Sequence, residues 1–483
     1  MAALLLPLVF SCGPLFLAAS PDSPLAGEAE TTLATEVLGL VMAASASGAG
    51  SAGASTDAPS GGGDSGATGG GVSGSSSGTQ QLGVATATTN GEAIATDASG
   101  NVYMVGFTNG DLDGVTRTGL TDFYLTKYDP AGDKRFTRML GVTARATYGY
   151  GVAADSAGNV YVAGYTLGNL DGQLKIGTWD LFLTKYDSAG NKQFTRLMGA
   201  IGKTTTAKAI VIDAADNIYL AGHTRGAIGG QTPSGNQDML LMKFDAAGNM
   251  IYTRLLGTFG GFVWGEDVAV DTSGNVFVTG YTSRGLNGNT QTGILDVFVA
   301  KYAANGTLQW ARQLGGPGSS TRGQGLATDA SGNVFATGYT NGGIDGNTLI
   351  GLNDTFLIQY DVAGTKAYTT TLGIAGANIQ ALAAVTDGTG AVYLSGYADA
   401  GMDGNALTGT ADLFLSKYDT GGTRLFTRQL GTAGQTTTTR ALAMNPGEII
   451  FTGGNTTGGL DGNVLMGAQD FFFAQYDTSG VKQ

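Results

Sequence analysis

The chain has 483 residues, and its 38 acidic against 25 basic side chains give a net charge of −13. This balance argues against nucleic acid and against direct adhesion to anionic lipid as partners, and it suits a protein that is soluble outside the cell. One histidine and one cysteine cannot build a Cys/His zinc cluster or a disulfide, so we expect no metal and no cofactor.

The first 19 residues are mostly apolar and contain no lysine or arginine. Pro7, Ser11 and Pro14 interrupt this run, which is shorter than the roughly 20 apolar residues of a membrane-spanning helix. Residues 1–20 are therefore interpreted as an export signal. The end of the stretch LVFSC resembles a bacterial lipobox, which would make Cys12 a lipidation point. Simple cleavage after Ser20 and a buried free thiol are the alternatives.

The composition changes over residues 21–77. Residues 27–44 could form one short helix, whereas residues 45–77 are nearly all glycine, serine and alanine. Such a composition is typical of a flexible tether. We expect this tether to carry a folded domain at residues 78–483. The protein would then be exported, and either lipid-anchored in the cell envelope or outer membrane, or secreted.

A unit of 58 residues fills the rest of the chain without insertion or deletion. The residue that opens its first turn recurs at this step, as Asp97, Asp155, Asp213, Asp271, Asp329, Asp387 and Asn445. A late aromatic residue keeps the same step, as Tyr128, Tyr186, Phe244, Tyr302, Tyr360, Tyr418 and Tyr476. Residues 78–483 number 406, which is seven units. Strict self-similarity of this kind marks a repeat architecture.

The second unit shows the local pattern. We expect four strands in it, at residues 151–155, 159–166, 180–187 and 192–198, joined by tight turns and by one long loop at 167–179. The second and third strands are apolar on both faces, which a strand needs only when both faces of its sheet are covered. Four-stranded sheets stacked around an axis meet that need. The sequence therefore predicts an all-β protein, a seven-bladed β-propeller of four-stranded blades.

The seventh unit stops where its fourth strand should begin. The missing piece lies at the other end of the domain, because Thr79–Gly83 is in register with the fourth strands of the other units: Gly83 and Gly141 are 58 residues apart. We expect this N-terminal strand to complete the C-terminal blade and close the ring, which removes two sheet edges that would otherwise be exposed.

The segment Ala95–Gly141, with ATDASGNVYMVGFT, LDG and TDFYLTKYDPAGDKRFTRMLG, resembles the bacterial SBBP family of seven-bladed β-propeller repeats. The resemblance covers residues 79–483. It implies a propeller of the bacterial cell envelope or the medium, similar to envelope lipoproteins, for which a ligand or reaction is usually not assigned. The third unit departs from the pattern, since Ile228-Gly229-Gly230 replaces Leu-Asp-Gly and Asp216 replaces a turn glycine.

Few residues are available for an active site. His223 occupies a position in the second strand where other units usually have Tyr or Phe, and it is best explained by packing. The sequence supports no Ser-His-Asp arrangement and has no Gly-x-x-x-x-Gly-Lys phosphate loop. We therefore expect a protein that is not an enzyme.

Polar residues that recur in most units fit a scaffold role better than a role in a single site. These are Lys127, Lys185, Lys243, Lys301 and Lys417 in the third strand, and Arg138, Arg196, Arg254, Arg312 and Arg428 in the fourth. We expect them to pair with aspartates or to cap carbonyls. The Leu-Asp-Gly loops, such as the one at Asp113, raise the alternative of calcium. Their spacing does not match a calcium loop, and Asp-Gly is a common turn pair.

Two long connections in each unit open on one face of a propeller, which we call the long-loop face, and we expect binding there. One position in the connection between units keeps its period but not its identity: Asn90, Tyr148, Thr206, Trp264, Arg322, Gln380 and Thr438. The candidate ligand-binding residues are Tyr148, Tyr150, Trp179, Phe259, Phe262, Trp264 and Arg322. As an exposed patch they would stack on sugars or anchor peptides; alternatively, the rings pack the ends of adjacent blades.

The sequence thus predicts a monomeric, non-catalytic binding or scaffold propeller on the bacterial cell envelope. Its partner would be a protein, or a component of the cell surface or matrix, held by the long-loop face. A carbohydrate-binding lectin is the first alternative. A hydrolase or lyase that uses carboxylates on the same face is the second.

Overall fold

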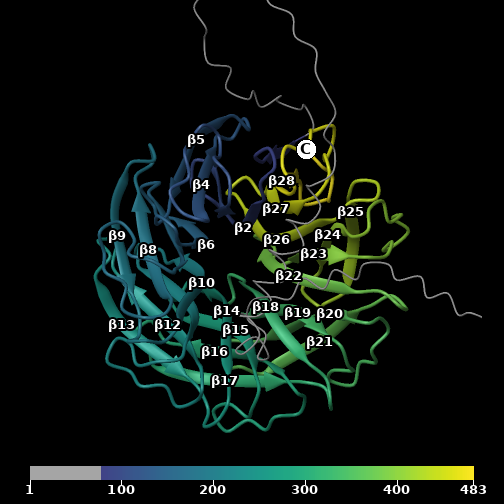
Figure 1. Ribbon diagram of the computed structural model, residues 1–483. Helices are drawn as coiled ribbons and strands as arrows, with labels where there is room; N and C mark the ends of the chain where they lie inside the picture. The colour runs from purple at the N-terminus through teal and green to yellow at the C-terminus, as the bar shows by residue number, and fades with distance from the viewer. Residues whose placement is uncertain (1–77) are drawn as a thin grey trace, which may run out of the picture. The chain divides into compact units, whose positions relative to one another are not determined.

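A computed structural model describes residues 78–483, in which 28 strands form seven four-stranded antiparallel sheets. The expected seven-bladed β-propeller is confirmed (Figure 1). The export signal, Cys12 and the tether lie outside the described residues. Within residues 78–483 no helix has the length and apolar character that a membrane crossing requires.

Six blades consist of four consecutive strands each, and the first of the four lies nearest the ring centre (Figure 1). The first blade contains β2 (Thr89–Thr96), β3 (Val102–Thr108), β4 (Asp122–Tyr128) and β5 (Lys134–Leu140). The next five blades contain β6 (Thr147–Ala154), β7 (Val160–Thr166), β8 (Asp180–Tyr186) and β9 (Lys192–Met198); β10 (Thr205–Ile212), β11 (Ile218–Thr224), β12 (Asp238–Phe244) and β13 (Met250–Leu256); β14 (Val263–Val270), β15 (Val276–Thr282), β16 (Asp296–Tyr302) and β17 (Leu308–Leu314); β18 (Thr321–Thr328), β19 (Val334–Thr340), β20 (Asp354–Tyr360) and β21 (Lys366–Leu372); β22 (Ile379–Thr386), β23 (Val392–Ala398), β24 (Asp412–Tyr418) and β25 (Arg424–Leu430).

The last blade closes the ring as expected. It contains β26 (Thr437–Met444), β27 (Ile450–Thr456), β28 (Asp470–Tyr476) and β1 (Thr79–Leu82). Thr79 pairs with Ala474 and Leu82 with Phe471 in an antiparallel ladder. The Gln81 side chain adds to this ladder, because its Nε2 donates to Gly458 O at 3.2 Å and its Oε1 accepts from Leu460 N at 3.0 Å. The strand expected at residues 79–83 is confirmed, and it completes the last blade and closes the ring.

One strand boundary was wrong in the sequence analysis. The first strand of the second unit begins at Thr147, not at residue 151. Gly149 and Gly151 lie within this strand and allow close packing, since a Cβ added at Gly151 would lie 2.9 Å from Ile210 Cγ2 of the next blade. The variable position at Asn90, Tyr148 and their counterparts therefore lies inside the innermost strands, not in a loop.

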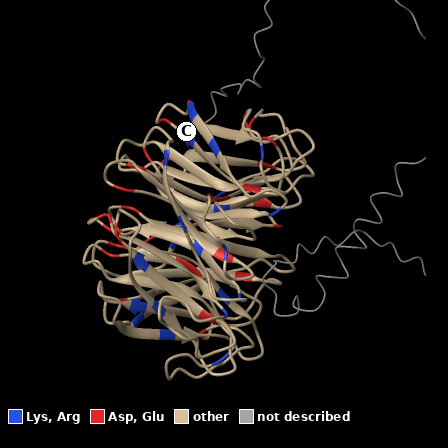
Figure 2. Cartoon of the chain, turned by 60° about the vertical axis from the view of Figure 1, so that its left-hand side comes forward, with Lys and Arg blue, Asp and Glu red and all other residues tan. Residues whose placement is uncertain are grey.

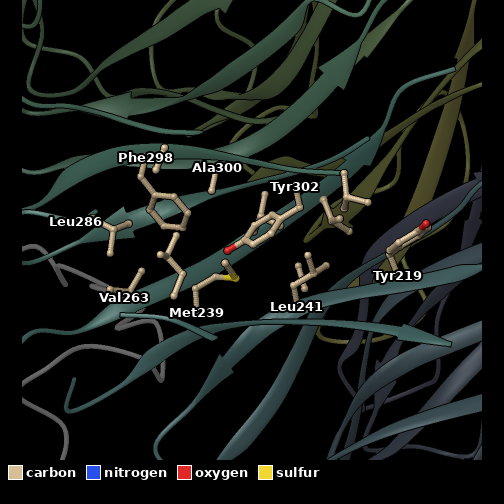
Figure 3. Packing of buried hydrophobic residues seen from close by; sticks show 14 of the residues in the cluster. Tyr219, Met239, Leu241, Val263, Leu286, Phe298, Ala300 and Tyr302 are labelled. Carbon is tan, nitrogen blue, oxygen red and sulfur yellow. The ribbon is translucent and has the colours of Figure 1, made fainter. Parts of the chain in front are cut away.

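Apolar side chains fill the space between successive blades. Between the third and fourth blades, Met239 and Leu241 of one sheet face Val263, Phe298 and Tyr302 of the other, all nearly fully buried (Figure 3). The second and third strands are covered on both faces in this way. This explains why their sequences are apolar without alternation.

A buried aspartate at the start of each third strand organises the long loop. In the first blade Asp122 is fully buried and accepts hydrogen bonds from Thr118 N and Gly119 N at 2.7 Å each. A Cβ added at Gly141, the last residue of the recurring fourth-strand motif, would overlap this carboxylate. All seven blades share the arrangement, at Asp122, Asp180, Asp238, Asp296, Asp354, Asp412 and Asp470. These residues cap the loop, which accounts for their recurrence.

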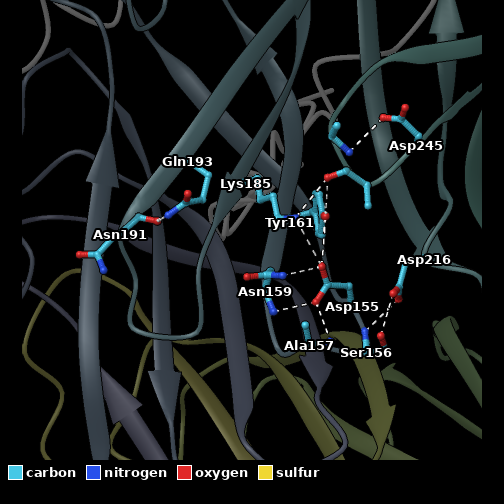
Figure 4. Close-up of polar contacts among 12 residues, drawn as sticks. Asp155, Ser156, Ala157, Asn159, Tyr161, Lys185, Asn191, Gln193, Asp216 and Asp245 are labelled. Atoms are coloured by element: carbon cyan, nitrogen blue, oxygen red, sulfur yellow. Dashed lines mark hydrogen bonds and ion pairs between the residues drawn. The ribbon is translucent and has the colours of Figure 1, made fainter.

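The recurring lysines and arginines join each blade to the next. Lys185 Nζ donates to Ala246 O at 3.1 Å, across the interface between the second and third blades, and lies 3.6 Å from Asp155 (Figure 4). Arg138 Nε donates to Gly190 O of the neighbouring blade at 2.8 Å. The expectation that these residues cap carbonyls within the scaffold is confirmed.

The Leu-Asp-Gly loops also have a structural explanation. Asp113 has a φ of 55°, a left-handed conformation that Asp, Asn and Gly tolerate best, and it forms an ion pair with Lys134. Equivalent pairs occur in four other blades, at Asp171–Lys192, Asp345–Lys366, Asp403–Arg424 and Asp461–Lys482. In the two remaining blades both partners change together, to Gly229 with Met250 and to Asn287 with Leu308. Because the aspartate and its cationic partner are replaced together, the recurrence of these aspartates is explained by the ion pair.

Candidate functional site

Every innermost strand carries a β-bulge at the same place. The pairing with the second strand skips one residue between Gly91 and Ala93, and does the same at the matching position of all seven blades. A bulge of this kind redirects a side chain and leaves it outside the ladder. The skipped residues, which we call the bulge ring, are Glu92, Tyr150, Lys208, Glu266, Gln324, Leu382 and Arg440.

Side chains of the bulge ring meet across the ring. Arg440 Nε of the last blade lies 3.6 Å from Glu92 Oε2 of the first, and Lys208 Nζ lies 4.3 Å from the centre of the Tyr150 ring. The Arg440 guanidinium also acts on Glu266 of the fourth blade. A group within electrostatic range of the first and fourth blades must lie near the axis. Since the Arg440 side chain is still 51% exposed, solvent reaches it there.

The charges in the bulge ring compensate each other. Burial raises the pKa of the Glu92 carboxyl above its usual value, and Arg440 and Lys208 oppose this shift. Glu92 in turn raises the pKa of Arg440. Burial thus outweighs the two cations at Glu92, whereas Glu92 favours the charged form of Arg440. The ring can offer a carboxylate and a guanidinium side by side to a polar ligand.

A row of stacked rings lies beside the bulge ring in the first two blades. Tyr165 stacks on Tyr150 with ring centres 5.6 Å apart and on Trp179 with centres 5.1 Å apart, both at an interplanar angle of 14°. Tyr148 lies between Tyr165 at 5.1 Å and Phe107 at 4.8 Å. These five residues, the aromatic row, include three of the candidates named from the sequence.

The remaining candidates lie elsewhere on the long-loop side. Trp264 stacks on Phe262 and Tyr281, with ring centres 5.7 and 4.7 Å apart, and Arg322 lies 5.0 Å from the Tyr281 ring. Trp264 is only 2% exposed, so its role as an exposed stacking residue was wrong: it packs inside the blade. Phe259, by contrast, is 92% exposed on the loop before β14. The seven candidates do not form one exposed patch.

The sequence analysis missed the bulge ring and the partners Phe107, Tyr165 and Tyr281. The signal was present, because the bulge position varies in every unit while its neighbours remain mostly glycine and alanine. The bulge position was overlooked because the innermost strand of the second unit was predicted to begin at residue 151, whereas it begins at Thr147. His223 is buried at the position in β11 that corresponds to Tyr165, as packing predicts.

Asp267, next to the bulge ring, is a partly buried carboxylate without a counterpart in the other blades, which have Ala or Gly there. Its Oδ2 accepts from Leu326 N of the next blade at 2.7 Å and its Oδ1 from Val268 N at 2.8 Å. Burial raises the pKa of Asp267 to about 7, although both hydrogen bonds oppose the shift. The native state therefore binds a proton at Asp267 more tightly than the unfolded chain does.

This shift predicts a pH-dependent stability. Between the unfolded pKa near 4 and the folded pKa of about 7, the native state holds more protons, so the free energy of unfolding should fall as pH rises. The slope contributed by this one group is at most about 1.4 kcal/mol per pH unit. Denaturant unfolding of the wild type and of Asp267→Asn from pH 4.5 to 7.5 measures it. A difference between the two proteins that stays constant over this range would contradict the prediction.

Metal chemistry finds no support in the described part of the chain. Across residues 78–483 no group of three or more His, Cys, Asp or Glu side chains is arranged to hold a metal ion. The polar groups that do converge belong to the bulge ring.

Comparisons with known proteins agree with the fold. The family model SBBP, described as a beta-propeller repeat, matches residues 78–113, 135–171, 193–230, 251–287 and 309–345. Regulatory protein FlaEY of Caulobacter vibrioides is 27% identical over 381 residues, which cover 68% of this chain and 38% of that protein. An uncharacterized WD repeat-containing protein of Acanthamoeba polyphaga mimivirus is 24% identical, over 52% of this chain and 24% of that protein. The chain thus spans well under half the length of both relatives.

Among solved structures, that of the polysaccharide lyase Uly1 matches with a TM-score of 0.48 and 13% identity, over 80% of this chain and 89% of that one.

Proposed function

Because the chain is a member of the SBBP β-propeller repeat family, we propose that it is an exported, non-catalytic binding protein of the cell envelope. Its partner is a protein that contacts the long-loop face around the axis. The observation that carries this proposal is the bulge ring, where seven equivalent positions hold six residue types that differ in charge, size and polarity. A position that the scaffold leaves free to vary, and that solvent reaches, is available for recognition.

The chemistry of the long-loop side supports binding over catalysis. The bulge ring places Arg440 beside Glu92, and the two form an ion pair. Either side chain could leave this ion pair and contact a polar group of the partner instead. The aspartates that recur there are committed to loop caps or to ion pairs with the fourth strand. The relative from Caulobacter vibrioides is named a regulatory protein, which also favours a partner over a substrate.

The aromatic row favours a second candidate, carbohydrate binding. Tyr150, Tyr165 and Trp179 form a continuous stack, and Trp179 is partly exposed at its outer end. Sugar rings bind to aromatic faces of this kind, and hydroxyl and amide groups nearby would add hydrogen bonds. A glycan of the cell surface would then replace the protein as the partner.

Binding measurements with matched variants test both candidates. The purified chain is immobilised and probed with envelope proteins and, separately, with a glycan array. We expect the double variant Tyr150→Ala/Lys208→Ala to bind the protein partner at least about tenfold more weakly, as loss of central contacts does. The control Arg135→Ala, on the tight-turn side, should bind normally. Equal binding by the double variant would contradict the proposed site, and glycan binding that Trp179→Ala abolishes would favour the lectin.

A further inference from the structure

Large apolar side chains are exposed on the long loops of several blades, and in the first four blades cations lie among them. We call the loops of the first four blades, residues 109–121, 141–146, 167–179, 199–204, 225–237, 257–262 and 283–295, the loop arc. Six of its apolar residues are between 54% and 92% exposed: Leu120, Leu174, Ile176, Ile201, Phe259 and Ile294. Single exposed apolar residues are ordinary, but six on the loops of four adjacent blades form a surface.

Cations lie between these apolar side chains. The loop arc contains Arg117, Arg145, Lys175, Lys203, Arg225 and Arg284, and none of the six forms an ion pair within residues 78–483. Backbone hydrogen bonds hold the two kinds of residue next to each other. Leu120 N donates to Arg145 O at 2.8 Å, and Gly202 N donates to Ile176 O at 3.2 Å.

Acidic groups are scarce on this surface. Asp113 and Asp171 are paired with lysines of the fourth strands, which leaves Asp111 as the one exposed, unpaired acid in these loops. The capping aspartates beneath the loops are buried, and each is held by two backbone N–H groups. Figure 2 marks the acidic and basic segments of the chain, and outside the loop arc the long loops also carry exposed acids, Asp345 and Asp403. Within the loop arc the six cations therefore outnumber the three acids, Asp111, Asp113 and Asp171.

We propose that the loop arc docks on an anionic lipid bilayer. The six apolar side chains would enter the boundary between headgroups and acyl chains, and the six cations would lie among the headgroups. The tight-turn side would face away. The net charge of the whole chain argued against adhesion to anionic lipid, but a bilayer interacts mainly with the charges on the face that contacts it. The proposal does not use the bulge ring, so it can fail while the proposed function holds.

Other occupants fit the loop arc less well. A second copy docked face to face would bring the cations of both copies together with few acids to meet them. Protein interfaces concentrate their binding energy in a central group of anchors with charges at the rim. Here apolar and cationic side chains alternate along an arc, and five of the six apolar residues are aliphatic. This composition suits a flat, anionic and fluid surface.

Vesicle sedimentation tests the proposal. The full chain carries Cys12→Ser, so that lipidation cannot contribute, and is mixed with vesicles of phosphatidylcholine that contain either no phosphatidylglycerol or about one third of it. We expect binding to the anionic vesicles, and weaker binding as salt is raised. The variants Lys175→Glu/Lys203→Glu and Ile201→Ser/Phe259→Ser should each lower the partition coefficient about tenfold or more.

The matched controls lie on exposed side chains away from the loop arc. Arg135→Glu and Val362→Ser/Val481→Ser change the same residue types where exposure is 51–56%, and they should leave vesicle binding unchanged. Unchanged melting temperatures would show that all variants are folded. Three results would overturn the proposal: no binding to anionic vesicles, equal binding to neutral ones, or equal losses in the controls. If the chain binds an acidic protein through these same side chains but does not bind anionic vesicles, the partner is a protein and the proposal is wrong.

Discussion

Deletion of Thr79–Gly83 should lower the free energy of unfolding by about 4 kcal/mol or more, the range of the largest single-site losses. Without β1 the β28 ladder loses its outer partner, and the buried side chains Phe471 and Phe473 lose cover. Asp470 also loses the hydrogen bond that Gln81 Nε2 donates at 3.0 Å. Denaturant unfolding and calorimetry measure the change, and the open edge should promote association of copies.

The control is a deletion of equal length at residues 69–73, which leaves β1 in the chain. It should unfold like the wild type. A peptide of residues 78–84, added to the shortened protein, should restore part of the lost stability because it can pair with β28. If the protein without residues 79–83 melts at the wild-type temperature, the ring does not depend on this closure.

Trp264→Ala should cost about 3–5 kcal/mol of stability, as large-to-small changes in a core do. The indole is 2% exposed and lies between the Phe262 and Tyr281 rings, so its removal leaves a cavity that two stacked rings cannot close. Urea unfolding measures the loss. Trp264→Phe should retain part of the stacking and recover part of the stability.

Phe259→Ala is the matched comparison, because this aromatic side chain on the loop before β14 is 92% exposed. Its stability should stay within about 0.5 kcal/mol of the wild type, as surface changes do. Equal losses in the two variants would show that Trp264 is not buried in solution. The prediction also guides binding experiments: a ligand lost in Trp264→Ala reports a damaged blade, whereas one lost in Tyr150→Ala reports a contact.

Much of the candidate site depends on features that a sequence pattern does not record. Tyr148, Tyr150 and Trp179 were found because aromatic residues stood out against a repeating background, and the structure brings them together through Tyr165. Trp264 stood out in the same way but is buried. Exposure depends on which rings the neighbouring strands supply, and that information lies in residues such as Tyr281, 17 positions further along the chain.

The sequence by itself determined the repeat, the number of blades, the tight turns and the closing strand. These follow from local backbone preference and from a period of 58 residues, which fixes register without reference to the third dimension. Only the tertiary structure decided which side chains reach the axis, since a bulge in each innermost strand turns Glu92, Arg440 and their counterparts out of the ladder. It also decided which charges are paired, because ion pairs join residues 21 positions apart, such as Asp113 and Lys134, and residues 30 positions apart, such as Asp155 and Lys185.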